Sequence, residues 1–414
     1  MAAVIFFRCR PAASRPREKK ISGWKKNLRR IRRPLPGAFF LLSILVLLGG
    51  LLYAPTNYTG LTYRVERVLQ WLDHAQWWWI HTPNYRMNDR ACGIEWLYAP
   101  LLLFTKSDRA LFLVNFIPFL LLPGLIYGIF TRLGVSARVA WAWMWLLPTG
   151  YNFILQAGSI ANDTFPTVFA LASVHYALRA QTSRQVSDLW YSLLAAALLT
   201  GAKASNLPLL LPWAVLIFPQ LPLLLKKNLP ATMGICFIAA IVSFLPNAIL
   251  NWHYCKDWTG AALEPSGLAM THPLTGIWGN ALLLVSGHVI PPLFPFAGWW
   301  NAHALEILPQ FLMAPMIANF EPGFHWVGEL PTEDWTGIGV GLALLLAASF
   351  VVAIFSRQSN ARPLPVSTWL VLIAAWISLL AYCVKSGMVT PQRLIAPYYP
   401  LLIASLLSGS ARSE

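Results

Sequence analysis

Long apolar runs separated by short polar segments make up most of the chain. They are roughly 17 to 25 residues long, which is the length that crosses a bilayer as a helix, and they lack the strict apolar-polar alternation of a membrane β-strand. We place these predicted spans at 37–54, 110–130, 138–156, 164–180, 188–202, 206–225, 230–250, 336–355, 365–384 and 394–410. The expected fold class is therefore all-α, a polytopic transmembrane helical bundle of about ten spans with juxtamembrane helices in its outer loops.

Two long polar segments and a basic start divide the chain into four parts. These parts are a basic cytoplasmic tail (1–36), a transmembrane module that includes an outer loop at 55–109 (37–250), a second outer segment (251–335) and C-terminal transmembrane helices (336–414). No small-residue cleavage site follows the first apolar run, so we expect a retained signal anchor.

The outer loop 55–109 holds two predicted helices that do not span. Between Leu61 and Leu72 apolar residues recur at helical spacing, which predicts an amphipathic helix on the outer membrane surface. Its apolar positions are Leu61, Val65, Val68, Leu69 and Leu72, and its polar positions are Arg64, Glu66, Arg67 and Gln70. The apolar core 93–104 is too short to span and predicts a juxtamembrane helix.

Aromatic residues and prolines raise two further alternatives in the outer segments. Trp77, Trp78 and Trp79 follow the amphipathic helix. Such a cluster is typical of an interfacial anchor, and a platform on which a sugar stacks is the alternative.

The stretch 277–300 is rich in proline and tryptophan, which argues against a straight spanning helix. A re-entrant element there and a true span both stay open.

Composition excludes a soluble globular protein. Hydrophobic residues make up 57% of the chain and charged residues 11%, whereas soluble domains are about a quarter charged. Twelve basic residues lie between Arg8 and Arg33, and with the expected inner loops 21 of the 31 basic residues are on that side. By the positive-inside rule both termini are cytoplasmic in a multi-pass protein of the cell membrane. The net charge of +15 therefore indicates contact with a membrane surface and not with nucleic acid.

Most acidic residues are expected on the outer side, and the cysteines show no recognisable pattern. Of the 16 acidic residues only Glu18, Asp188 and Glu414 fall inside, which leaves the others on the outer side for chemistry. The five cysteines form neither a disulfide framework nor a metal-binding spacing. A bridge between the outer pair, Cys92 and Cys255, stays open, and so does a divalent metal as a cofactor.

Asp163 is the one carboxylate in the stretch 156–165, between two apolar runs that are each long enough to cross a bilayer. An ionisable group at such a depth is by default a candidate functional residue. The alternative is that Asp163 caps the helix that follows it, since an acid at the N-cap suits the helix dipole. Both roles can hold at once.

Two cations stand at the outer ends of predicted spans. Lys203, in the turn between two short apolar runs, either snorkels to lipid headgroups or meets an anionic ligand. Arg393 stands at the outer entrance to the last span. Arginine is suited to bidentate phosphate recognition and stays charged when partly buried; the alternative is again a snorkelling side chain.

No P-loop and no GxGxxG, HExxH or GxSxG motif occurs in the chain. What remains is a set of outer carboxylates, two outer cations and aromatic surface. Such a set suits group transfer from an anionic lipid-linked donor, because cations hold the leaving phosphate while a carboxylate removes the acceptor proton.

Four segments resemble the glycosyltransferase C superfamily, polytopic enzymes that use polyprenyl-phosphate-linked sugars. These segments are LTYRVERVLQWL, QAGSIANDTFPTVFALAS, LLTGAKAS and TPQRLIAPYYPLL, and they are similar to bacterial members related to the protein mannosyltransferase and lipid A aminoarabinose transferase group. The resemblance covers most of residues 37–250 and the last span. It implies that Asp163 matches the second acidic position, and that Lys203 and Arg393 match positions that face the donor phosphate.

The sequence departs from that family just after the first span, where members usually carry an acidic residue that is the expected general base. Here residues 57–60 read Asn-Tyr-Thr-Gly, and Thr59 cannot serve as that base. Glu66 lies seven residues beyond Thr59, two helical turns or about 10 Å away, and Asp73 lies seven further. Either carboxylate could substitute, or transferase activity has been lost.

The expected function is a membrane glycosyltransferase that moves a sugar from a polyprenyl-phosphate-linked donor to an unknown acceptor on the outer face. The candidate catalytic residues are Asp163, Glu66 and Asp73, and the candidate substrate-binding residues are Lys203, Arg393 and Trp78. The alternative is a non-catalytic or transporter-like protein that binds a lipid phosphate or a polysaccharide. Most predicted spans lack charged residues deep inside them, which argues against an ion-coupled transporter. The expected partners are the lipid-linked donor, the acceptor and membrane lipid.

Overall fold

The computed structural model describes residues 33–226, 228–263, 268–290, 295–322, 324–330, 332–355 and 364–408. Within these ranges all regular structure is helical, apart from one isolated β-bridge between Ala269 and Ser386. The all-α prediction is confirmed. Most of the predicted basic tail, residues 1–32, and the predicted inner loop around Arg357 and Arg362 lie outside the described residues.

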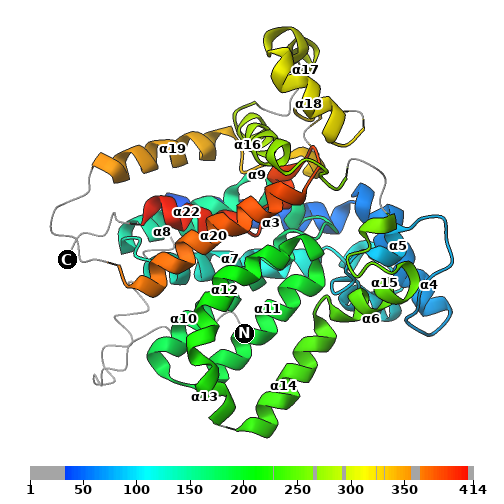
Figure 1. The fold of residues 1–414 in the computed structure, drawn as a ribbon, viewed down its shortest axis with the longest axis vertical. Coiled ribbons are helices and arrows are strands. Elements are labelled where there is room, and N and C mark those ends of the chain that lie inside the picture. Colours follow the sequence, from blue (N-terminus) through cyan, green and yellow to red (C-terminus); the bar gives the residue numbers. More distant parts are fainter. Residues whose placement is uncertain are drawn as a thin grey trace.

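The first half of the chain forms helices of 4 to 20 residues (Figure 1). They are α3 (Pro34–Leu52), α4 (Val65–Asp73), α5 (Arg86–Asp89), α6 (Glu95–Thr105), α7 (Leu113–Arg132), α8 (Ala137–Leu146), α9 (Tyr151–Ala157), α10 (Thr164–Ser183) and α11 (Val186–Ala202). Short turns join some of them: the π-helical turn η1 (Gly60–Arg64) and the 3-10 turns η2 (Asp108–Ala110) and η3 (Leu147–Thr149).

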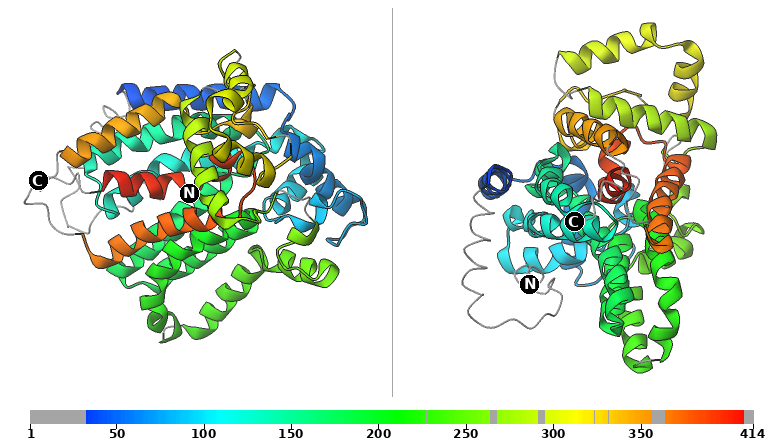
Figure 2. Two further views of the ribbon diagram at one scale, coloured as in Figure 1. Left: turned by 45° about the horizontal axis from the view of Figure 1, so that its top comes forward. Right: turned by 90° about the vertical axis from the view of Figure 1, so that its left-hand side faces the viewer.

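The second half is more often interrupted. It comprises the 3-10 turn η4 (Ala204–Leu209), α12 (Leu210–Ile217), the 3-10 turn η5 (Phe218–Gln220), α13 (Leu221–Lys226), α14 (Leu229–Val242), α15 (Leu245–Cys255), the 3-10 turn η6 (Ala261–Leu263), α16 (Pro273–Val289), α17 (Phe296–Ile307), α18 (Gln310–Asn319), the 3-10 turn η7 (Glu333–Trp335), α19 (Val340–Phe355), α20 (Val366–Lys385), α21 (Pro391–Leu394) and α22 (Tyr399–Leu407). Helices α16 to α18 stand at the edge of the bundle (Figure 2).

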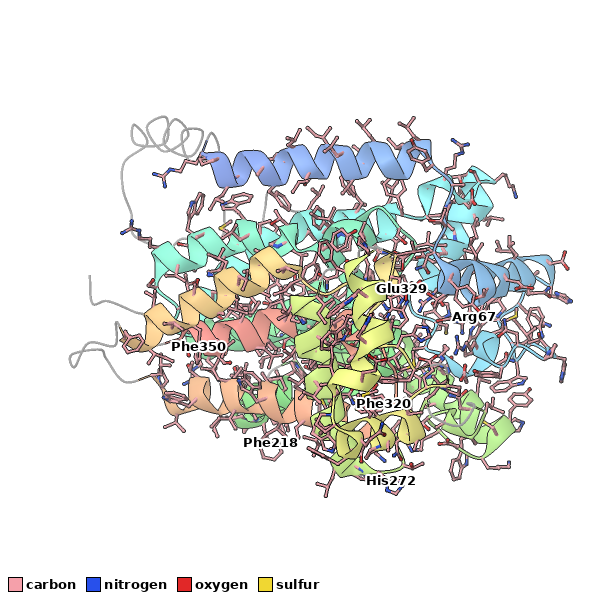
Figure 3. All side chains as sticks on the ribbon, turned by 90° about the horizontal axis from the view of Figure 1, so that it is seen from above. Arg67, Phe218, His272, Phe320, Glu329 and Phe350 are labelled. Carbon is pink, nitrogen blue, oxygen red and sulfur yellow. The ribbon has the colours of Figure 1, made fainter. Side chains whose placement is uncertain are left out.

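The long helices lie side by side and give the bundle two ends that differ in polarity (Figure 3). The polar end carries the described residues of 53–112, 158–163, 203, 256–263, 332–339 and 386–398; Arg67 marks it in Figure 3, opposite Phe350. Its turns are joined by amide hydrogen bonds: Asn115 of α7 donates to Ser159 O at 3.0 Å, and Asn162 donates to Ala202 O at 3.2 Å.

The other end, which we call the basic end, carries Arg33, Arg132 and Arg184. There Arg179 of α10 and Asp188 of α11 form an ion pair at 3.3 Å across their connecting turn. Gly134, in the turn after α7, lies against the side chain of Leu364 and has φ +88, a conformation that favours glycine. Among the described residues, every carboxylate except Asp188 therefore lies away from the basic end, whereas arginines occur at both ends.

Five helical segments in the described residues are long and apolar enough to cross a membrane. They are Pro34–Leu52, Asp108–Arg132, Ala204–Leu223, Glu333–Phe355 and Val366–Lys385. The pair Leu229–Val242 and Leu245–Cys255, bent by 52°, makes a sixth if it counts as one span. The chain is thus a multi-pass helical membrane protein, and the count of about ten spans stays a prediction. Breaks such as the one at Pro148, in η3, keep other apolar segments below the length of one continuous span.

The core of the bundle is aromatic and aliphatic and runs between α3, α7, α8 and α10. The rings of Phe39 and Phe119 lie 5.2 Å apart, and those of Phe39 and Trp145 lie 5.6 Å apart. Packing of this kind ties α3 to α7 and α8. The turns at the polar end are thereby held on rigid helices.

The amphipathic helix in the first outer loop forms, but two of its predicted polar positions are buried in the protein. Arg64 and Arg67, assigned to the polar face, are only 4% and 1% exposed, whereas Leu61 and Leu69 are exposed. The physical reason is Glu95 of α6: Arg67 Nη2 lies 2.7 Å and Arg64 Nη1 lies 3.6 Å from its carboxylate. A buried carboxylate therefore draws the two arginines inward.

Three other expectations from the sequence meet different outcomes. The short helix predicted at 93–104 is confirmed as α6. Cys92 and Cys255 are both free thiols, so the bridge left open between them does not form. The stretch 277–300 is not one straight helix, because α16 ends at Val289 and α17 begins at Phe296; whether it re-enters a membrane stays a prediction.

Candidate functional site

Five segments that lie far apart in the sequence meet at the polar end around Asp163. They are the turn after α3, the turn between α9 and α10, the residue that follows α11, the 3-10 turn η7 and the short helix α21. We call the group Asn57, Asp163, Lys203, Glu333, Asp334 and Arg393 the polar cluster. Lys203, Arg393 and Asp163 were expected there from sequence, and the structure brings these three together.

Asp163 occupies the N-cap position of α10 without acting as a hydrogen-bonding cap. It is 1% exposed, and its side chain accepts no bond from the first turn of the helix. Its carboxylate instead contacts the Lys203 ammonium and accepts a hydrogen bond from Gln156 Nε2 at 3.1 Å. Gln156 Oε1 in turn accepts from the Asp163 backbone N–H at 3.2 Å. The amide of Gln156 thus fixes both the backbone and the side chain of Asp163.

Lys203 and Arg393 approach this carboxylate from different elements. Lys203 follows α11 in an extended conformation and is 17% exposed, with its ammonium on Asp163 Oδ1. Arg393, in α21, is 9% exposed; its Nε lies 3.9 Å from Asp163 Oδ2, and its Nη1 contacts Asp334. Both cations therefore pair with carboxylates of the protein, and neither extends away from it.

The charges in the polar cluster shift the proton affinities of its members. Burial alone would raise the pKa of the Asp163 carboxyl, but the Lys203 and Arg393 cations outweigh it and lower that pKa. Burial also lowers the pKa of the Lys203 ammonium to about 8, although Asp163 opposes the shift. Asp163 is therefore a fixed negative charge at neutral pH, and Lys203 is a cation that loses its proton only under mildly alkaline conditions.

Sequence reasoning did not assign a role to Glu333 or Asp334, the first two residues of η7. Glu333 accepts a hydrogen bond from Asn57 Nδ2, so it lies against the turn that follows α3. Asp334 pairs with Arg393. The available signal was two adjacent acids just before an apolar run, and nothing local in the sequence says which distant residues they meet.

A second buried group supports the cluster from the side of α4 and α6. Arg64 and Arg67 share the carboxylate of Glu95, and Arg64 Nη2 donates to Tyr63 Oη at 2.9 Å. Tyr98 Oη, also buried, donates to Ile160 O at 3.0 Å in the turn before Asp163. The Tyr98 bond holds the loop of Asp163 without using the carboxylate itself.

The remaining candidates from sequence lie elsewhere at the polar end. Glu66 and Asp73 line a surface groove of about 940 Å³ between α4 and α6, together with Lys106 and Asp108. Asp73 is 82% exposed, and its one ion-pair contact in the described residues is with His74 at 3.6 Å. The ring of Trp78 packs against His74, with centroids 4.5 Å apart. The structure brings none of Glu66, Asp73 or Trp78 into the polar cluster.

A divalent metal finds no ready ligand set in the part of the chain that the structure describes. No group of three or more His, Cys, Asp or Glu side chains there has a geometry that could hold a metal ion. Within the polar cluster, Lys203 already pairs with Asp163 and Arg393 with Asp334, and these are carboxylates that a metal cation would need.

Two solved structures are similar to this chain. They are ArnT from Cupriavidus metallidurans in the apo state and ArnT from the same organism bound to undecaprenyl phosphate. In both comparisons the sequence identity is 13% and the TM-score 0.40, and the alignment covers 90% of this chain and 78% and 77% of those chains. No family model and no curated protein matches the chain. At this level of similarity neither structure identifies the function of this chain.

Proposed function

We propose that this protein is a membrane glycosyltransferase that moves a sugar from a polyprenyl-phosphate-linked donor to an acceptor at the polar end. The observation that carries the proposal is the convergence of Lys203 and Arg393 on the buried Asp163 carboxylate. Ion pairs buried in this way contribute little to stability, because desolvation offsets most of the attraction. A requirement for paired cations near the membrane surface explains their presence better than stability does.

The proposed role of the two cations is to hold the donor phosphate. An ammonium and a guanidinium side by side neutralise the charge that grows on a phosphate as its bond to the sugar breaks. Asp163 fixes both cations in place beforehand, so that little rearrangement is needed during the reaction. Lys203 and Asp334, 17% and 27% exposed, form the accessible edge of the cluster from which a headgroup would enter.

A non-catalytic lipid-phosphate-binding protein is the second candidate, and one observation favours it. Both cations already contact carboxylates of the protein itself, Lys203 with Asp163 and Arg393 with Asp334. A phosphate would therefore compete with Asp334 for Arg393. This arrangement suits reversible binding of an anionic headgroup as well as catalysis.

A transfer assay separates the two candidates. Purified protein in liposomes would be mixed with a panel of synthetic polyprenyl-phosphate sugars, and release of free polyprenyl phosphate would be measured with and without membrane extract as a source of acceptors. The proposal expects that polyprenyl phosphate is released from the donor that carries one particular sugar, and that this release increases when the extract is present. Binding of undecaprenyl phosphate without release from any donor in the panel would favour the non-catalytic candidate.

We also propose that the polar end faces outward and the basic end faces the cytoplasm, in line with the positive-inside rule. Single cysteines at the exposed positions Ala137 and Gln76 test this in intact cells treated with an impermeant thiol reagent. The cysteine at 76 should react and the one at 137 should be protected. The reverse pattern would invert the topology.

A further inference from the structure

The carboxylates at the polar end differ in whether a cation already holds them. Asp163 is held by Lys203 and Arg393, and Asp334 is held by Arg393. Glu95 is held by Arg64 and Arg67. A carboxylate paired with a cation is a poor proton acceptor, because the pairing stabilises its ionised form. Each of these three is therefore already engaged by a cation of the protein.

Glu333 is different. Its Oε1 accepts a hydrogen bond from the neutral amide of Asn57, and it makes no ion pair within the described residues. The Ser159 hydroxyl also faces the carboxylate, but Oε2 is buried and has no hydrogen-bond partner in the described structure. A buried polar atom without a partner is unusual in a native protein and calls for an explanation such as a bound substrate group.

The surroundings hold this carboxylate in one orientation. Asn57 Oδ1 accepts from Thr59 Oγ1 at 2.8 Å and from the Gly60 backbone N–H at 2.6 Å, so the amide of Asn57 can present only its Nδ2 to Glu333. On the other side, Gln392 Nε2 donates to Trp335 O at 3.3 Å and ties η7 to α21. Glu333 is thereby fixed next to Asp334, whose partner Arg393 belongs to the proposed phosphate site.

We infer that Glu333 is the general base that removes the proton from the acceptor, with Asn57 as its positioning residue. The inference rests on the proposed glycosyl transfer. The acceptor O–H gives its proton to Glu333 Oε2 while the acceptor oxygen forms a bond to the anomeric carbon of the sugar. The bond from that carbon to the phosphate oxygen breaks, and its electron pair leaves with the polyprenyl phosphate next to Lys203 and Arg393. Deprotonation of Glu333 by solvent completes the cycle.

The test compares Glu333→Gln with Glu329→Gln, the same change at an exposed position four residues upstream. In a wild-type protein that transfers sugar from a polyprenyl-phosphate donor, Glu333→Gln should lower turnover by about 100-fold or more, the size of a general-base contribution. Its binding of undecaprenyl phosphate should stay within about twofold of wild type, since phosphate contacts and base act at different steps. Glu329→Gln should change neither quantity.

A second variant protects the test from a simple folding defect. Asn57→Asp combined with Glu333→Gln moves the carboxylate to the other side of the same hydrogen bond. Turnover of this double variant should be at least about tenfold higher than that of Glu333→Gln alone. Rescue by a displaced carboxylate is not expected if Glu333 only stabilises the fold. Full turnover in Glu333→Gln would overturn the inference alone, and so would failure of the double variant to recover any activity. Absence of transfer by the wild type would overturn the proposed function and the inference together.

Discussion

Two groups of carboxylates at the polar end differ in their burial and in the charges around them. Asp163, Glu333 and Asp334 come from segments far apart in the sequence and meet in a partly buried cluster with two cations. Glu66 and Asp73 come from the two ends of one short helix, α4, and line a surface groove. Water screens charges in the groove, so each acid there interacts only weakly with its charged neighbours. In the cluster each charge depends on its neighbours, and chemistry can be tuned there.

The largest expected effect is on stability and concerns Asp163. A capping role alone predicts that Asp163→Asn is nearly neutral, because asparagine caps about as well as aspartate. The structure predicts a loss of about 3 to 5 kcal/mol, since the change leaves the buried Lys203 and Arg393 without their shared counter-charge. Unfolding of the detergent-solubilised protein measures it. Glu66→Gln and Asp73→Asn in the groove should stay within about 0.5 kcal/mol of wild type.

A double change checks that this loss arises from the uncompensated charge. Asp163→Asn with Lys203→Met removes both partners of the closest pair, so its effect should be smaller than the sum of the two single effects. If the effects simply add, the two side chains do not interact and the cluster described here is wrong.

The next largest expected effect is on lipid binding. It is tested by comparing one cation of the polar cluster, Arg393, with one cation of the groove, Lys106. Arg393→Ala should weaken binding of undecaprenyl phosphate by about 1.5 to 3 kcal/mol, the value of a charge-assisted hydrogen bond. Arg393→Lys should recover only part of it, because the planar two-donor geometry is lost. Lys106→Ala, an exposed cation of the groove, should leave binding unchanged. A stronger effect of Lys106→Ala would place the lipid phosphate in the groove.

The smallest effect is on the pH dependence of the same binding. The pKa of Lys203 is about 8, so its charge is present at pH 7 and is about 90% lost at pH 9. If that charge holds the phosphate, affinity falls as pH rises through 8, by up to about tenfold. Lys203→Arg should remove the pH step, because a guanidinium keeps its proton throughout this range. Persistence of the step in Lys203→Arg would assign it to another group.

The parts of the fold that sequence predicts are those set by local patterns. Apolar run length predicts the helices, and the position of the acidic residues along the chain predicts that most carboxylates lie away from one end of the bundle. Asp163, Lys203 and Arg393 could be found because each interrupts or borders an apolar run, where a charge is conspicuous.

The parts that sequence missed depend on contacts between distant segments. The orientation of α4 follows from Glu95, which draws Arg64 and Arg67 inward although their spacing places them on a polar face. The pairing of Glu333 with Asn57 joins residues 276 positions apart. Only packing of the whole bundle brings such residues together, so no local pattern in the sequence could name the pair.

The central claim is that the polar cluster, and not the groove, holds the phosphate of the donor. The most direct measurement is a cryo-electron microscopy structure of the protein bound to undecaprenyl phosphate. We expect the phosphate within hydrogen-bond distance, about 3 Å, of both the Lys203 ammonium and the Arg393 guanidinium, with Asp334 displaced from Arg393. A phosphate bound at Lys106 between α4 and α6, with the pairs of the polar cluster unchanged, would contradict the claim.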